Sequence, residues 1–200
     1  MIRLLLGVFV ASLALFLFGF LYWGLNPLPY TAWSLPQDEP RAIEALRLHF
    51  PQRGTYFVPG RDPNHTITEE KFKKGPLAFV FLISQQGRSM EDPSIMIQGY
   101  LLSLFGLLLI GYQLRQVRSA LPTYRSRVLF TALSGVIAST MILLGDIVWW
   151  QMPEDWKLWQ ALYHIIGWTI AGAVLARFID DPQAAAPKTA NPAPAEAKPA

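Results

Sequence analysis

The feature that most constrains this chain is a set of four long apolar runs. A helix needs about 20 apolar residues to cross a hydrocarbon core about 30 Å thick. Four segments reach that length with at most one strongly charged interior residue each: 4–23, 95–112, 128–150 and 158–178. They predict an integral membrane protein with four transmembrane helices.

The composition supports this class and excludes several others. Of the 200 residues, 52% are hydrophobic and only 16% are charged, whereas an ordinary soluble domain has roughly 25% charged residues. The chain has no cysteine, which excludes disulfides, thiolate metal sites and a lipoprotein anchor. A formal net charge of +3, without basic clusters interleaved with aromatics, gives no indication of nucleic-acid binding.

The first apolar run is interpreted as an uncleaved anchor. It is longer than the roughly 7 to 15 apolar residues of a signal-peptide core, and no small-x-small cleavage site follows it. The resulting domain map has four parts. They are transmembrane helix 1 (1–24), an extracytoplasmic α+β domain (25–94), transmembrane helices 2–4 (95–180) and a disordered cytoplasmic tail (181–200).

The predicted fold is therefore a membrane all-α bundle of four transmembrane helices, with a small α+β extracytoplasmic domain inserted between helices 1 and 2. Its direction follows from the basic residues, which are retained on the cytoplasmic side. The connection 113–127 carries four arginines and no acid, whereas the segment 151–157 has one lysine against two acids. Both termini are thus expected in the cytoplasm. The aromatic residues Tyr22, Trp23, Trp149, Trp150, Trp156 and Trp159 are expected at the outer interface.

The inserted segment contains local signals for four short elements. Apolar residues at helical spacing predict a helix over 39–50. Segments 55–58 and 77–84 are rich in β-branched and aromatic residues, so they are expected to pair as two strands and to pack on that helix. Between them, Thr68 is expected to cap a short helix that ends at Lys74. The tail 182–200 is rich in alanine and proline and is expected to be disordered.

Two ionisable residues inside the spans, Asp146 and His164, form the candidate site. If 151–157 is the turn between spans three and four, its centre lies near Asp155, nine residues from each of them. An antiparallel helix pair then places them at the same depth, on faces rich in small residues. Gln98 of span two enters at comparable depth and is expected to join this intramembrane polar pair.

The pair allows two interpretations. Hydrogen bonding between Asp146 and His164 would fasten the helices together, whereas a titrating pair would carry protons or bind a ligand. No cofactor and no metal site is expected. A bis-histidine haem would need a second histidine in the spans, and His49, His65 and Asp62 do not supply an evident third ligand for a metal set.

Three function classes remain open at this stage. The first is a non-enzymatic subunit, assembly factor or interaction partner of an envelope complex, with a membrane-protein partner or homo-oligomer, the lipid bilayer and no nucleic acid as its contacts. The second is a small transporter or channel component that uses Asp146 and His164. A membrane enzyme is third, because no catalytic constellation is evident. The expected location is a bacterial inner membrane, which makes the inserted domain periplasmic.

Overall fold

The structure is a computed structural model that describes residues 2–90 and 92–179. It contains four helices long and apolar enough to cross a membrane, which confirms the four predicted spans: Ile2–Leu25, Pro93–Gln116, Tyr124–Trp150 and Glu154–Leu175. The chain divides into two compact units. The helical unit contains the chain up to Trp33 and from Ser94 onward, and the inserted unit is Ser34–Pro93. The tail 181–200, predicted to be disordered, lies outside the described residues.

The helical unit contains two helices that change winding within a span. The first span is α1 (Ile2–Gly19), which continues as the π-helical segment η1 (Phe20–Leu25) and is followed by the 3-10 helix η2 (Leu28–Ala32). The third span is α5 (Tyr124–Ser139), the π-helical segment η3 (Thr140–Leu144) and α6 (Gly145–Trp150). The second and fourth spans are the uninterrupted helices α4 (Pro93–Gln116) and α7 (Glu154–Leu175).

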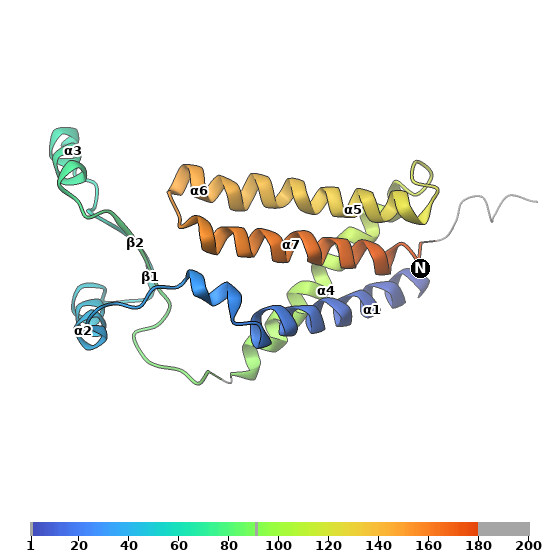
Figure 1. The fold of residues 1–200 in the computed structure, drawn as a ribbon, viewed down its shortest axis with the longest axis horizontal. Helices are drawn as coiled ribbons and strands as arrows, with labels where there is room; N and C mark the ends of the chain where they lie inside the picture. The colour runs from blue at the N-terminus through green and yellow to red at the C-terminus, as the bar shows by residue number, and fades with distance from the viewer. Residues whose placement is uncertain (1, 91, 180–200) are drawn as a thin grey trace, which may run out of the picture. The chain divides into compact units, whose positions relative to one another are not determined.

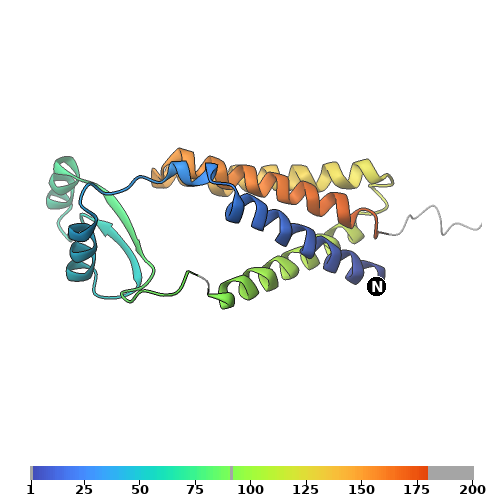
Figure 2. The same ribbon diagram turned by 60° about the horizontal axis from the view of Figure 1, so that its bottom comes forward.

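The helices α5 and α7 run side by side in opposite directions (Figures 1 and 2). Glycines at two levels permit this close approach. A Cβ placed on Gly135 would lie 2.5 Å from the Cβ of Trp168, and one on Gly172 would lie 2.8 Å from the Cβ of Thr131. Only a residue without a side chain fits at such distances, as is common where membrane helices approach closely.

A second contact region joins α1, α4 and the C-terminal half of α7. On α4, the buried residues Leu107, Gly111 and Leu114 face this core, while most of the rest of the helix is exposed. The N-terminal end of α4 diverges from α7 in both ribbon views (Figures 1 and 2). The buried core cluster comprises Leu4, Val8, Ala11, Leu107, Leu114, Ala171, Leu175 and Ile179.

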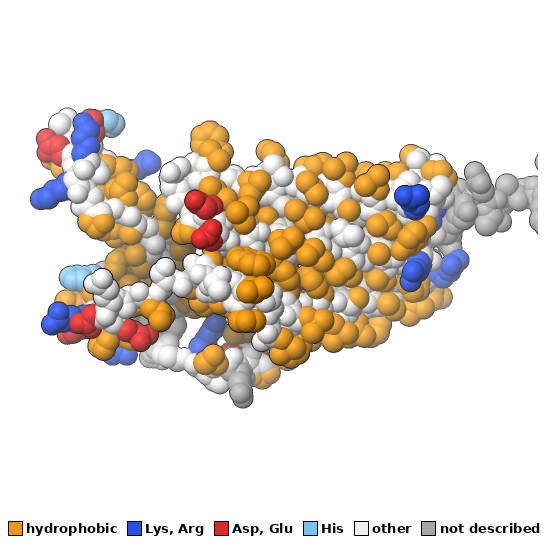
Figure 3. All heavy atoms as spheres, in the orientation of Figure 1, with side chains coloured by type: hydrophobic (Ala, Val, Ile, Leu, Met, Phe, Trp, Pro, Cys, Tyr) orange, Lys and Arg blue, Asp and Glu red, His pale blue; other side chains and the backbone are white. Residues whose placement is uncertain are grey.

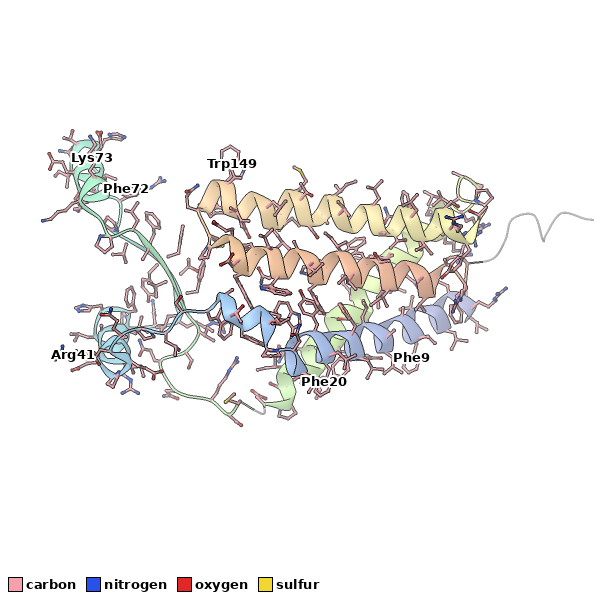
Figure 4. All side chains as sticks on the ribbon, viewed as in Figure 1. Phe9, Phe20, Arg41, Phe72, Lys73 and Trp149 are labelled. Atoms are coloured by element: carbon pink, nitrogen blue, oxygen red, sulfur yellow. The ribbon has the colours of Figure 1, made fainter. Side chains whose placement is uncertain are left out.

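Apolar side chains also cover the face of the helical unit that Figure 3 shows, between its two ends. Phe9, Phe20 and Trp149 point away from the bundle (Figure 4) and are each more than half exposed. Water would solvate such a surface poorly, whereas lipid chains solvate it well. The exposed apolar surface therefore agrees with helices that span a bilayer.

The inserted unit contains the predicted helix and strand pair. The helix is α2 (Glu39–His49), and Asp38 caps it by accepting a hydrogen bond from the backbone N–H of Arg41. The strands β1 (Gly54–Val58) and β2 (Ala78–Leu82) pair antiparallel, with Gly54 opposite Leu82 and Val58 opposite Ala78. The predictions of a helix over 39–50 and of pairing between 55–58 and 77–84 are confirmed.

The third element of this unit corrects the sequence interpretation. The helix α3 spans His65–Lys74 and is capped by Asn64, not by Thr68. Asn64 is the better cap because its side-chain oxygen reaches the N–H of Thr66, two residues on. The hydroxyl of Thr68 instead accepts a hydrogen bond from the backbone N–H of Asp62.

The sheet was expected to pack on α2, but no residue of that helix is buried. Phe50, just after α2, contacts the ring of Tyr56 in β1 at 4.9 Å between centroids. On the other side, Phe57 of β1 contacts Phe72 of α3 at 5.4 Å. The strand β1 therefore has aromatic contacts to both flanking segments.

Candidate functional site

The carboxylate of Asp146 is paired with a lysine. Its Oδ2 accepts a hydrogen bond from Nζ of Lys157 at 2.8 Å. The side chain of Asp146 is 24% exposed and that of Lys157 is 12% exposed, so the ion pair is largely buried. Among the described residues, Asp146 has no side-chain hydrogen bond to His164. Its partner is the lysine that was assigned to the turn from the sequence.

The register of the helical hairpin explains this difference. The turn is only 151–153, because α7 already begins at Glu154. Three contacting pairs lie at equal distances in sequence on either side of a point between residues 151 and 152. They are Thr131 with Gly172, Gly135 with Trp168, and Asp146 with Lys157.

The hairpin centre is therefore three to four residues earlier than the sequence interpretation placed it. His164 lies two helical turns beyond Lys157 on α7, a distance of about 10 Å along the helix axis. The same register places Ser139 of α5 at the level of His164. Asp146 and His164 therefore do not lie at the same depth.

Three polar side chains at this depth lack a hydrogen-bond partner within the described part of the chain. Ser139 is 4% exposed, and its buried Oγ has no partner. Gln160, one helical turn before His164, has a buried Oε1 that also lacks one. His164 itself is exposed on the surface of the helical unit and contacts the ring of Tyr163. The spacing of four residues between Gln160 and His164 could have shown from the sequence that they share a face.

Gln98 does not join these groups through any hydrogen bond in the described residues. It lies near the N-terminal end of α4 and is exposed. That end of the helix diverges from α7 (Figure 2). The three residues predicted as one site thus do not come together. Asp146 pairs with Lys157, and His164 and Gln98 are both exposed.

Aromatic side chains fill the contact between the first span and the beginning of α7. Phe18 stacks on Tyr163 at 5.2 Å between centroids. The hydroxyl of Tyr22 donates to the backbone carbonyl of Trp159 at 2.9 Å, so its polar end is satisfied within the contact. Ring contacts extend this aromatic cluster, which comprises Phe18, Tyr22, Trp23, Tyr30, Trp33, Trp156, Trp159 and Tyr163. The cluster fastens η1 and η2 to α7 and explains several of the aromatic residues near the ends of the spans.

Arg127 has a structural role that was not predicted. The sequence places it among the arginines that set orientation, but it is only 4% exposed. Its Nε donates to the carbonyl of Leu121, and its Nη1 donates to the carbonyls of Ala176 and Ile179 at 3.4 and 3.0 Å. A cation is favourable beside the unpaired carbonyls at a helix C-terminus. Arg127 therefore caps the end of α7.

The inserted unit contains a hollow of about 460 Å³ beside the start of α3. Asp62 lies at its edge. Its carboxylate accepts a hydrogen bond from the backbone N–H of Asn64 and pairs with Lys71 at 3.2 Å. These two interactions hold the pKa of Asp62 below its ordinary value. The lining side chains include Arg61, Asp62, His65, Thr68, Glu69 and Phe72.

Within residues 2–90 and 92–179, no three histidine, aspartate or glutamate side chains lie together so that they could hold a metal ion. Comparison with known proteins gives no match: no protein-family model, no curated protein and no solved structure resembles this chain.

Proposed function

We propose that this protein is a non-enzymatic membrane subunit that binds a transmembrane helix of another protein through α4. The observation that carries the proposal is the surroundings of Gly99 and Gly106. A Cβ placed on either one meets no atom within 4 Å. At four other glycines of the helical unit, an added Cβ would lie less than 3.0 Å from a side-chain atom of another segment. These glycines are Gly7, Gly111, Gly135 and Gly172.

The open glycines form a stripe with Ser103 along one side of α4. Their spacing of four and three residues places Gly99, Ser103 and Gly106 on one helix face. Ser103 donates to the carbonyl of Gly99 at 2.9 Å, so its hydroxyl is satisfied within the helix. In membranes, small residues at this spacing let two helix backbones approach closely. The neighbouring face of α4, with Gly111, already packs on Leu4 and Val8 of the first span. The stripe itself is not covered by that span, so an external helix can pack on it.

Exposed polar groups in the spans support an external partner. Gln98 precedes the stripe on α4, and His164 is exposed near the middle of α7. A polar side chain facing hydrocarbon is costly, and such residues usually face protein or a water-filled space. A partner helix carrying a hydrogen-bonding side chain beside Gln98 would remove this cost.

The inserted unit offers a second surface for association. Near β2, Leu77, Phe81 and Ile83 are each more than half exposed. In the described residues the sheet has only two strands, so each strand keeps one edge without a neighbour. Open edges with apolar residues are sites where another chain can add a strand. This supports a subunit that contacts its partner both within and outside the membrane.

Partner binding through α4 is tested by filling the stripe. The double variant Gly99→Leu/Gly106→Leu is expected to abolish co-purification of the partner after cross-linking in native membranes, because two side chains then occupy the contact face. Thermal stability of the purified chain should not change, since both positions are open. The matched control is Phe105→Leu, which alters an exposed residue of α4 away from the stripe.

Equal partner recovery from the double variant and from the control would contradict this proposal. If a second copy of this chain is the sole cross-linked species, α4 mediates self-association and does not bind a different protein.

We further propose a bacterial inner-membrane location with cytoplasmic termini and an extracytoplasmic inserted unit. The support is the charge distribution of the helical unit. Basic side chains lie at the end that contains the N-terminus, and Glu154 and Asp155 lie at the end with the α6–α7 turn (Figure 3). Basic residues are retained in the cytoplasm.

Fusions at Arg61 and Ser119 test the direction: a reporter active only in the cytoplasm should be inactive at Arg61 and active at Ser119. The reverse pattern would invert the topology.

A small transporter or channel component is the second candidate. The observation that favours it is the set of polar groups at the level of His164, where Ser139 and Gln160 have unpartnered buried oxygens. Such groups can hold water or pass protons across a bilayer. Proton flux into liposomes that depends on His164 would favour this candidate over the subunit.

A further inference from the structure

The hollow beside α3 is built by a short piece of chain with a defined conformation. The loop before α3 supplies Arg61 and Asp62, and the first turns of α3 supply His65, Thr68 and Glu69. Thr68 fixes the loop to the helix, because its hydroxyl accepts from the N–H of Asp62 and donates to the carbonyl of the same residue. The charged side chains around the hollow are therefore held near one another by backbone contacts.

The charges around the hollow are not equally available. Asp62 is paired with Lys71 at 3.2 Å, and Glu69 is paired with Lys73 at 2.6 Å. Both acids thus have a cationic partner on α3. Arg61 is exposed and has no hydrogen bond or ion pair within the described residues. The guanidinium of Arg61 is therefore the charged group at the hollow that is free to bind a ligand.

Beyond the association through α4, we infer that this hollow binds a small monocarboxylate that carries an apolar group. The planar guanidinium of Arg61 can donate two parallel hydrogen bonds to one carboxylate. The apolar part of the ligand lies against Phe72, which is half-buried and contacts the ring of Phe57 of β1 at 5.4 Å between centroids. A volume of about 460 Å³ is in the range of pockets for small molecules.

The balance of charges at the hollow decides the charge of the ligand. The carboxylates of Asp62 and Glu69 line the same hollow as Arg61. Both are paired with lysines, so among the described residues the one unpaired charge at the hollow is the guanidinium of Arg61. A ligand with a single negative charge balances that guanidinium. A monocarboxylate has one charge spread over two oxygens, and these two oxygens can accept both hydrogen bonds from the guanidinium of Arg61.

The experiment uses the full ¹⁵N-labelled chain in lipid nanodiscs, with benzoate as the probe and inorganic phosphate as the comparison. Benzoate is expected to cause saturable shifts of the backbone amides between Arg61 and Glu69. The variant Arg61→Gln should weaken this binding by about tenfold, the usual effect of losing a charge-assisted hydrogen bond. The matched control Arg47→Gln removes another exposed arginine of the inserted unit and should leave the binding unchanged.

Three results would overturn the inference. The first is the absence of saturable shifts with benzoate. The second is equal benzoate affinity in Arg61→Gln and in the control. The third is phosphate binding as tight as that of benzoate, which would exclude a site selective for monocarboxylates. Unchanged amide positions elsewhere in the Arg61→Gln spectrum show that the variant is folded.

Discussion

Replacing Gly135 by alanine is expected to destabilise the helical unit by about 3 kcal/mol, at the upper end of the usual cost of overpacking. The added methyl would lie 2.5 Å from the Cβ of Trp168 and 2.6 Å from its Cγ. Both atoms are close to the backbone of α7, so rotation of a flexible side chain cannot relieve the clash. The helices α5 and α7 would have to separate, and the contact between Gly172 and Thr131 one turn away would loosen with them.

The measurement is the midpoint of thermal unfolding in detergent, followed by tryptophan fluorescence. Gly106→Ala is the matched control, because it makes the same chemical change at a helical glycine whose added methyl meets nothing within 4 Å. It should leave stability unchanged or raise it slightly, since alanine is the better helix former. If Gly135→Ala and Gly106→Ala have equal midpoints, α5 and α7 do not pack as closely as the contact between Gly135 and Trp168 requires.

Much of this packing could be predicted from the sequence, because it depends on local residue patterns. The four spans follow from the length of uninterrupted apolar runs, and a bilayer permits little other than helices for such runs. The face of small residues on the third span, with Gly135 and Thr131, was also evident. In the inserted unit, apolar residues at helical spacing located α2, and segments rich in β-branched and aromatic residues located both strands.

The register of the hairpin between α6 and α7 was the main error, and the sequence contained a signal against it. Pro153 followed by Glu154 and Asp155 is typical of a helix start, since proline fits the first positions and acids favour the N-terminal end of the helix dipole. Residues 154–157 are therefore the first turn of α7 and not part of the connection. Asp146 and His164 consequently lie at different depths.

Other features of the site depend on contacts between distant segments and had no local signal. The burial of Arg127 follows from where α7 ends relative to α5, which is decided by packing. The π-helical segments η1 and η3 are also not visible in residue periodicity. The hollow near Arg61 required knowing that the lysines of α3 pair with Asp62 and Glu69. Side-chain pairing of this kind is fixed by geometry that composition does not reveal.

Replacing Asp146 by leucine is expected to destabilise the helical unit by about 2–3 kcal/mol. Removing one member of a buried ion pair costs about 3–5 kcal/mol, because the other charge is left uncompensated. Here the cost is reduced because Asp146 and Lys157 keep 24% and 12% exposure, and a lysine near a helix end can turn its ammonium toward the interface. Asp146→Asn should cost less than leucine but more than nothing, since an amide accepts the hydrogen bond without neutralising the charge.

A double-mutant cycle decides which residue is the partner of Asp146. Asp146→Leu combined with Lys157→Met is expected to be much less destabilising than the sum of the single changes, because no unpaired charge remains. The matched control combines Asp146→Leu with His164→Leu. Those effects should add, since His164 lies about 10 Å along the α7 axis from Lys157, the residue of α7 that pairs with Asp146. Thermal unfolding in detergent measures all five variants. An additive result with Lys157 and a strong coupling with His164 would restore the pairing predicted from the sequence and would refute the register of the α6–α7 hairpin.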